Sequence, residues 1–396
     1  MPSDAASDQK RFTGRVATGI SDMQPSYFAF VLATGIISTD AFLLGPSWLS
    51  VALLGIASTG FAVLIAALVV WLDRYRSRVV AELQAPERVF GFFAISASCD
   101  VLGGRYAAAG HPMVATALAC LAAVVWFALT YGVPASLLLA RQRDSVLNGV
   151  DGTWLLWVVA TQSLSIDAAT LLPAWPSQAR LLATAAVALW SVGLLLYLLL
   201  IALIWQRWLT VAITPATLSP PYWILMGATG IIVLAGSDIL TLPATLPAIS
   251  AIAGYVKGTC IVFWSFGTWL IPLLVILGFW RHVLRQWPLR YEAALWTVVF
   301  PIGMYGAASR SLGKAAGLSF MEPLSRGVLW VAAAVWLLVA AAGLARLARG
   351  PAATRHASDP THADMTGDLQ PPSRLQRPAP ASANPTLPGP RLPALS

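Results

Sequence analysis

Four aspartates lie inside or beside long apolar runs of this chain, where ionisable side chains are rare: Asp40, Asp100, Asp167 and Asp238. A carboxylate at membrane depth is costly and usually has a functional role. Such a group can carry a proton or pair with an arginine, and near the end of a helix it can simply cap that end. The sequence leaves these interpretations open.

Basic side chains come late in two of the apolar runs, at Arg105, Arg310 and Lys314. Cations at the mouth of a pore attract anions and raise their local concentration. Long basic side chains also reach from a helix end to the lipid headgroups. These residues are therefore candidates for a pore mouth or for anchors at the membrane surface.

A proline follows an aromatic residue inside the apolar stretch Leu295–Arg310. Pro301 removes a backbone donor and kinks a helix, and within a membrane the freed carbonyl needs cover from protein or from a water-filled cavity. Phe300 stands directly before it, and small residues follow. An aromatic plug at a kink indicates a constricted pore, whereas small residues also suit close packing between helices.

The composition places these residues in a helical membrane protein. The chain has 396 residues, of which 58% are hydrophobic and 11% charged, and its mean hydropathy is +0.72; no ordinary soluble protein of this length has that balance. The basic residues behind the net charge of +8 lie in short loops, so we expect no nucleic-acid partner. Ten spans are predicted at about 24–44, 48–72, 89–109, 112–140, 152–172, 179–206, 221–243, 252–280, 292–314 and 324–347.

The distribution of Lys and Arg predicts the orientation of these spans. Fifteen of them flank one side of the predicted bundle and six the other, which places both termini in the cytoplasm of a plasma (inner) membrane protein. The predicted parts are a cytoplasmic segment 1–22, a transmembrane domain 23–347 and a Pro-rich cytoplasmic tail 348–396. The tail has few large apolar residues, so we expect it to be disordered.

An internal repeat organises the predicted spans. YFAFVLATG (Tyr27–Gly35) and YWILMGATG (Tyr222–Gly230) share an aromatic pair and a final Ala-Thr-Gly, and WLLWVVATQ (Trp154–Gln162) lies in the same register. Five such anchors, each followed by a helical hairpin, predict parallel repeats about an axis along the membrane normal. The anchors are Ala33, Ala97, Ala160, Ala228 and Pro301.

The first helix of each predicted hairpin is the more polar one. An inner ring of polar, Gly-bearing helices within an outer apolar ring predicts an all-α membrane protein, with ten transmembrane helices as five hairpins in a quasi-five-fold arrangement around a central pore. The pore-lining candidates are Thr34, Gly35, Ser38, Ser96, Thr161, Gly227, Gly230 and Gly303.

Five segments of the chain resemble one known family of membrane transporters. They are PSYFAFVLATGIIS (Pro25–Ser38), FGFFAISASCDVLGGR (Phe90–Arg105), PPYWILMGATGII (Pro220–Ile232), FWSFGTWLIPLLVILGFWR (Phe263–Arg281) and LWTVVFPIGMYGAAS (Leu295–Ser309). The chain resembles the tellurite-resistance/C4-dicarboxylate transporter family of voltage-dependent anion channels, which includes plant slow anion channels, fungal malate permeases and fungal sulfite pumps.

The resemblance implies a pore lined by the odd-numbered helices, usually in a homotrimer with one pore per subunit. It also implies a Phe from the ninth helix that closes the pore at mid-membrane. Phe300 matches that gate by its place before Pro301. When the five repeats are aligned at their anchors, the residues that share the position of Phe300 are Leu32, Ser96, Val159 and Gly227. These five residues are here called the Phe300 column.

The expected function is movement of small inorganic or organic anions through a Phe-gated pore in the lipid bilayer. The alternatives are a proton-coupled C4-dicarboxylate (malate-type) carrier or a tellurite or sulfite transporter, and, from another class, a membrane-bound enzyme. An enzyme is disfavoured because Cys99, Cys120 and Cys260 lack metal-site spacing and the histidines avoid mid-span. We therefore expect no catalytic residue, no metal and no cofactor.

Overall fold

The structure is a computed structural model that describes residues 19–139 and 146–349. The chain divides into two compact units, Met1–Arg346 and Leu347–Ser396. Most of the predicted N-terminal segment 1–22 and nearly all of the predicted tail 348–396 lie outside the described residues. Every regular element in the described ranges is a helix, which confirms the prediction of an all-α protein.

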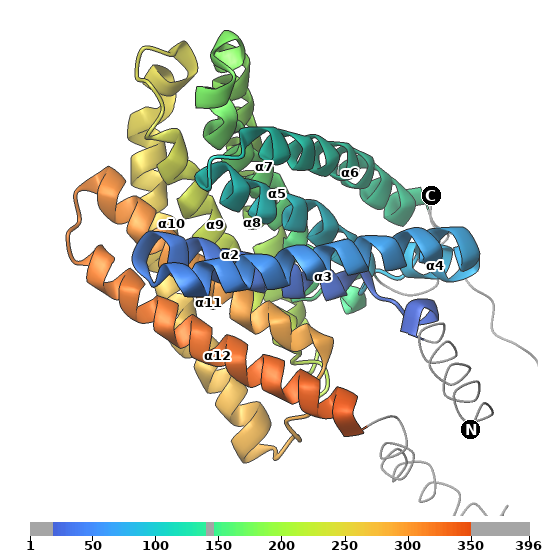
Figure 1. The fold of residues 1–396 in the computed structure, drawn as a ribbon. Helices are drawn as coiled ribbons and strands as arrows, with labels where there is room; N and C mark the ends of the chain where they lie inside the picture. The colour runs from blue at the N-terminus through green and yellow to red at the C-terminus, as the bar shows by residue number, and fades with distance from the viewer. Residues whose placement is uncertain (1–18, 140–145, 350–396) are drawn as a thin grey trace, which may run out of the picture. The chain divides into compact units, whose positions relative to one another are not determined.

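A group of buried helices, here called the inner helices, carries all the aspartates discussed above. Their bounds are α2 (Ala29–Leu44), α5 (Phe93–Ala108), α7 (Leu156–Leu171), α9 (Ile224–Ile239) and α11 (Trp296–Ala316). Within the described chain, each contacts two others of the group, in the cyclic order α2, α5, α7, α9, α11 and back to α2 (Figure 1). They are buried on most faces, which is typical of helices enclosed by other helices.

Longer helices, here called the outer helices, follow the inner ones along the chain. They are α3 (Ser47–Arg74), α6 (Pro112–Leu139), α8 (Ala179–Thr210), α10 (Pro247–Phe279) and α12 (Met321–Arg349). The most apolar 18-residue stretch of α6 is only 17% buried, whereas the corresponding stretch of the span that contains α7 is 83% buried. Exposed apolar side chains on a long helix suit contact with lipid.

Eight helices of the described chain are long and apolar enough to cross a membrane. They include all the outer helices together with α2, α7 and α9. Helix α5 carries Asp100 and Arg105, and α11 carries Arg310 and Lys314. These two helices are therefore less apolar and fall outside that group, although both pack among the inner helices.

Each inner helix begins from a short 3₁₀ turn. These turns are η1 (Pro25–Phe28), η2 (Val89–Phe92), η4 (Gly152–Leu155), η7 (Pro220–Trp223) and η9 (Ala293–Leu295), and they contact one another in the same cyclic order as the helices. The packing between η4 and η7 is backbone against backbone, because a Cβ on Gly152 would lie 2.0 Å from the carbonyl oxygen of Pro221. Only glycine fits there.

The sequence did not predict every element. Helix α4 (Arg76–Leu83) is a short amphipathic segment directly after α3, and it buries Val79. Helix α10 begins at Pro247 rather than near residue 252, because Pro247 takes an early position where its missing N–H costs nothing.

Candidate functional site

A cavity of about 710 Å³ opens among the C-terminal halves of the inner helices. Each inner helix contributes a residue four positions after the Phe300 column: Ile36, Asp100, Ser163, Ile231 and Met304. Each inner helix also contributes the residue eleven positions after its member of the Phe300 column: Leu43, Ala107, Thr170, Asp238 and Ser311. Steps of four and then seven residues stay on one face of a helix, so the repeat register read from the sequence describes the cavity wall.

The Phe300 column lies one helical turn beyond the cavity and is tightly closed. Leu32, Val159 and Phe300 are no more than 1% exposed, and no member of the column is among the cavity-lining residues of the described chain. Pro301 packs on the neighbouring helix, where a Cβ on Gly227 would lie 2.9 Å from its Cγ. The cavity therefore ends short of Phe300 in the described chain.

The predicted pore-lining glycines lie at the seams between neighbouring inner helices. A Cβ on Gly35 would lie 2.6 Å from Val101 Cγ1, one on Gly230 3.1 Å from Met304 Cγ, and one on Gly303 2.9 Å from Ile36 Cγ2. Small residues let helices approach closely. These glycines therefore set the width of the inner ring, and pore lining by them stays a prediction.

The predicted pore-lining hydroxyls are hydrogen-bonded to the outer helices. Thr34 Oγ1 accepts from the Trp336 indole at 2.9 Å, and Thr161 Oγ1 accepts from the Trp126 indole at 2.9 Å. Ser38 donates to the Ser50 carbonyl at 2.8 Å, and Ser96 donates to the Ala122 carbonyl at 3.0 Å. Pore lining by these side chains likewise stays a prediction.

Other hydroxyls line the cavity itself: Thr39, Ser163, Thr170 and Ser311. None of these four was predicted from the sequence as a site residue. The signal that could have found Ser163, Thr170 and Ser311 is their spacing of four or eleven residues from the Phe300 column.

The four aspartates fall into two groups. Asp100 and Asp167 line the cavity from adjacent helices, and both oxygens of Asp100 are buried without a hydrogen-bond partner in the described chain. Asp238 also lines the cavity, whereas Asp40 is 1% exposed and lies outside its lining. Arg310 acts electrostatically on both Asp40 and Asp238. The equal sequence offsets of Asp40 and Asp167 thus lead to different surroundings.

The three predicted pore-mouth cations also differ. Arg105 and Arg310 line the cavity, and Lys314 lies farther along α11, exposed and outside the lining. Arg105 is 3% exposed, and its Nε and Nη2 donate to Ser50 Oγ at 3.2 and 2.8 Å. The Phe42 ring lies 4.1 Å from its guanidinium carbon.

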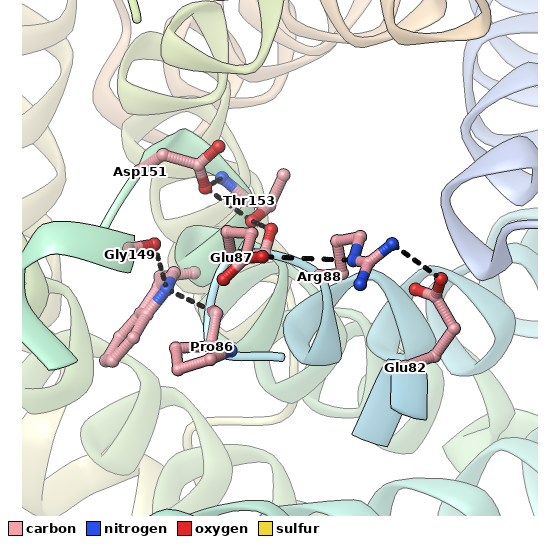
Figure 2. A network of polar contacts seen from close by, with 8 residues as sticks. Glu82, Pro86, Glu87, Arg88, Gly149, Asp151 and Thr153 are labelled. Atoms are coloured by element: carbon pink, nitrogen blue, oxygen red, sulfur yellow. Dashed lines mark hydrogen bonds and ion pairs between the residues drawn. The ribbon is translucent and has the colours of Figure 1, made fainter. Parts of the chain in front are cut away.

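A polar network lies at the opposite end of the inner helices, among the 3₁₀ turns (Figure 2). Asp151 Oδ1 accepts from the Thr153 backbone N–H at 2.9 Å and so caps η4, while Arg88 pairs with Glu82 at 3.0 Å. The Trp154 indole donates to the Pro86 carbonyl at 2.9 Å. Burial raises the pKa of Asp151 to about 6, although bonds from Thr153 oppose the shift. None of the residues in this network was predicted as a site residue from the sequence.

Comparison with known proteins identifies relatives of the chain. The family model for voltage-dependent anion channels matches residues 22–344. An uncharacterized membrane protein of Mycobacterium tuberculosis is 48% identical over 153 residues, which are 39% of this chain and 77% of that protein. An uncharacterized transporter of Methanocaldococcus jannaschii is 24% identical over 330 residues, which are 81% of this chain and 92% of that protein. Because the family model covers nearly all of the described helices, this chain belongs to the voltage-dependent anion channel family.

Proposed function

We propose that the chain moves small anions across a membrane along the axis of the inner helices, with Phe300 as the gate. Family membership supports membrane anion transport in general. The observation that carries the finer proposal is the cavity, which all inner helices line at the same register positions and which ends one turn before the Phe300 column. A blind cavity that stops at a buried ring is the geometry of a closed pore.

The proposed architecture has ten transmembrane helices as five hairpins in quasi-five-fold order, with α5 and α11 crossing the membrane inside the ring. Enclosure by other helices removes the need for a strongly apolar surface, which is why two helices with charged residues can cross. We place the cavity on the outer side of the plasma membrane, because the Lys and Arg distribution assigns the starts of the inner helices to the cytoplasm. The proposed assembly is a homotrimer.

The experiment that tests the function is anion flux into proteoliposomes that contain the purified full chain. Chloride, nitrate, sulfite, malate and tellurite are compared at two pH values, with protein-free liposomes as the control. Saturating or conductive uptake of at least one anion supports the proposal. Absence of uptake for every anion, from protein that remains a single species on size-exclusion chromatography, would contradict it.

A proton-coupled carrier is the second candidate, and the presence of Asp100 and Asp167 on adjacent helices of the cavity wall favours it. Two carboxylates that share a site repel each other, so such a pair can hold a proton between them. Stoichiometric movement of protons with malate, sulfite or tellurite would distinguish this carrier from a channel. Turnover of a substrate by detergent-purified protein would instead indicate a membrane enzyme.

A further inference from the structure

Arg105 is a buried cation held in a fixed position at the cavity wall. Its guanidinium lies against the Phe42 ring, with 4.1 Å between the guanidinium carbon and the ring centroid. Two of its nitrogens, Nε and Nη2, donate to the single acceptor Ser50 Oγ. Ser50 in turn donates to the Ser38 carbonyl at 2.8 Å. These contacts orient the guanidinium but do not balance its charge.

The remaining nitrogen of this guanidinium has no partner. Nη1 is buried and makes no hydrogen bond within the described residues, and no carboxylate of the described chain lies within ion-pair distance of Arg105. Arg310 differs, because Asp40 and Asp238 lie within its electrostatic reach. A buried charge without a counter-charge is strongly unfavourable, so Arg105 requires an anion that the described protein does not supply.

We propose that Arg105 is a binding site for a small oxyanion, such as a carboxylate or nitrate, inside the cavity. The inference rests on the proposed function and deepens it, because it names the chemistry of the bound anion. Nη1 keeps both of its N–H groups and Nη2 keeps one, so this edge of the guanidinium has donors for two oxygens of one planar anion. Nη1 is covered in this structure, so the bound anion displaces the side chains that cover it. The cavity of about 710 Å³ leaves ample room for such an anion.

The other ionisable groups of the cavity make this attraction necessary. Asp100, Asp167 and Asp238 line the same space, and Arg310 is shared with Asp40. Any charge on the aspartates repels an anion, so Arg105 supplies the attraction that a bound anion needs. A deeper donor is available at Ser163, whose Oγ is buried without a partner in the described chain. By helix rise it lies about 7–8 Å further toward Phe300.

Thermal stability of the detergent-purified full chain tests the site without any need for transport. Acetate or nitrate replaces chloride at constant total salt, and the unfolding temperature is followed as a function of the new anion. A ligand that binds only the folded protein raises this temperature in a saturating manner. We expect a saturating rise with acetate and with nitrate for wild type, and about tenfold weaker binding for Arg105→Gln.

Two further variants separate binding chemistry from charge and from folding. Arg105→Lys keeps the charge but loses the two-point geometry, so we expect it to lose the preference for acetate and nitrate over chloride. Arg180→Gln removes an exposed cation outside the cavity lining and should respond as wild type does. Should Arg105→Gln fail to fold, judged by size-exclusion chromatography, Arg105→Lys carries the test.

The inference is overturned if wild type gives no saturating response, if chloride stabilises it as well as acetate does, or if the folded Arg105 variants titrate like wild type. Because the measurement reports binding alone, it is independent of the proteoliposome result. Anion flux together with unchanged binding in the Arg105 variants would contradict the Arg105 site and still support the proposed function. Anion binding at Arg105 without anion flux would support the site and contradict the proposed function.

Discussion

At the scale of single residues, neighbours rather than residue type determine what a polar group can do here. The Thr34 hydroxyl accepts a hydrogen bond from an outer-helix tryptophan, while Ser163, also on an inner helix, faces the cavity without a partner. Asp40 and Asp100 differ in the same way, because Asp40 lies behind the cavity wall and Asp100 lines it. Function at this site therefore depends on which face of each inner helix a residue occupies.

The first residue-scale prediction concerns Phe300. Replacing a buried Phe that only packs by Ala lowers the free energy of unfolding by about 3–5 kcal/mol. Phe300 adjoins the end of a cavity, so its truncation should lower stability by less and should open a path for anions. We expect Phe300→Ala to raise anion flux per assembled protein above wild type, with Phe300→Leu between the two. Proteoliposome flux or anion current, with oligomer integrity checked by size-exclusion chromatography, is the measurement.

The matched control is Phe93, which is also fully buried on an inner helix and packs against Phe90 and Trp157. Phe93→Ala should lose stability without any gain in flux. Unchanged or lower flux from well-folded Phe300→Ala would show that Phe300 is not the gate.

The second residue-scale prediction concerns the cavity carboxyls. Asp167→Asn and Asp100→Asn each remove an ionisable carboxyl from the cavity wall, where its negative form repels an anion. We expect each variant to flatten the pH dependence of uptake, with faster uptake at neutral pH because repulsion is lost. Initial rates of anion uptake from pH 5 to 8 measure this effect.

Asp40 provides the comparison for this experiment, because it is buried beside the same helices but does not line the cavity. Asp40→Asn should keep the wild-type pH profile. If Asp40→Asn changes the pH profile of uptake and neither cavity variant does, Asp40 and not the cavity carboxyls would be responsible for the pH dependence.

At the scale of elements, hydrogen bonds hold the inner helices to the outer ones, and close glycine contacts hold them to one another. Indole N–H groups of outer helices donate to inner-helix hydroxyls three times, at Thr34, Thr161 and Ser309, in the described chain. The 3₁₀ turns add a second layer of packing at the starts of the inner helices. The rigid layer at that end and the cavity at the other make the inner helices asymmetric along their length.

The element-scale prediction concerns Asp151, which caps η4 just before its span. Burial raises the pKa of Asp151 to about 6, above its ordinary value of about 3.9, so the folded protein binds this proton more tightly than the unfolded chain does. Its contribution to stability is therefore full below about pH 4 and is lost as the pH rises through 6. This contribution to the free energy of unfolding is about 2–3 kcal/mol at most.

Asp151→Asn keeps an oxygen that can accept the Thr153 N–H and removes the charge. We expect this variant to lose less stability than wild type between pH 4 and 7, as measured by thermal unfolding in detergent at several pH values. Parallel curves for the two proteins would show that Asp151 does not titrate in this range. Asp73→Asn, at an exposed site, serves as the control for a general effect of charge.

At the scale of the whole molecule, the arrangement separates chemistry from lipid. Polar and ionisable side chains gather on the inner helices, while the outer helices carry exposed Leu, Val and Phe, for example Val51, Phe127 and Leu195. A bilayer has no water to satisfy polar groups in its core. A wall of apolar helices around a polar interior is therefore the condition under which a cavity with several charges can exist at all.

The whole-molecule prediction is the orientation of the bundle. Reporters fused after Arg76, Arg143 and Arg349 should be cytoplasmic, and those near Pro46 and Pro176 periplasmic or extracellular, because the loops of the first group hold the excess of Lys and Arg. Alkaline phosphatase and fluorescent protein fusions measure the two sides. A cytoplasmic reading at Pro176 would remove the pairing of spans into hairpins and with it the proposed five-fold order.

The sequence by itself determined the all-helical membrane class, the positions of the helices and the register in which Phe300 aligns with Leu32 and Gly227. These features follow from local chemistry, since long apolar runs must form helices in a bilayer and repeated motifs enter the fold in the same way. Pro301 inside α11 was also evident from the sequence.

Only the tertiary structure decided which faces of the inner helices meet the cavity. Thr34 and Thr161 looked like pore residues because they are polar within apolar runs, yet their hydroxyls bond to outer tryptophans. The approach of Asp100 and Asp167 to one cavity and the unpaired Nη1 of Arg105 depend on how neighbouring helices are rotated about their axes. That rotation is set by packing between residues far apart in sequence, such as Gly35 with Val101, and apolar periodicity carries little information about it when a helix is buried on every side.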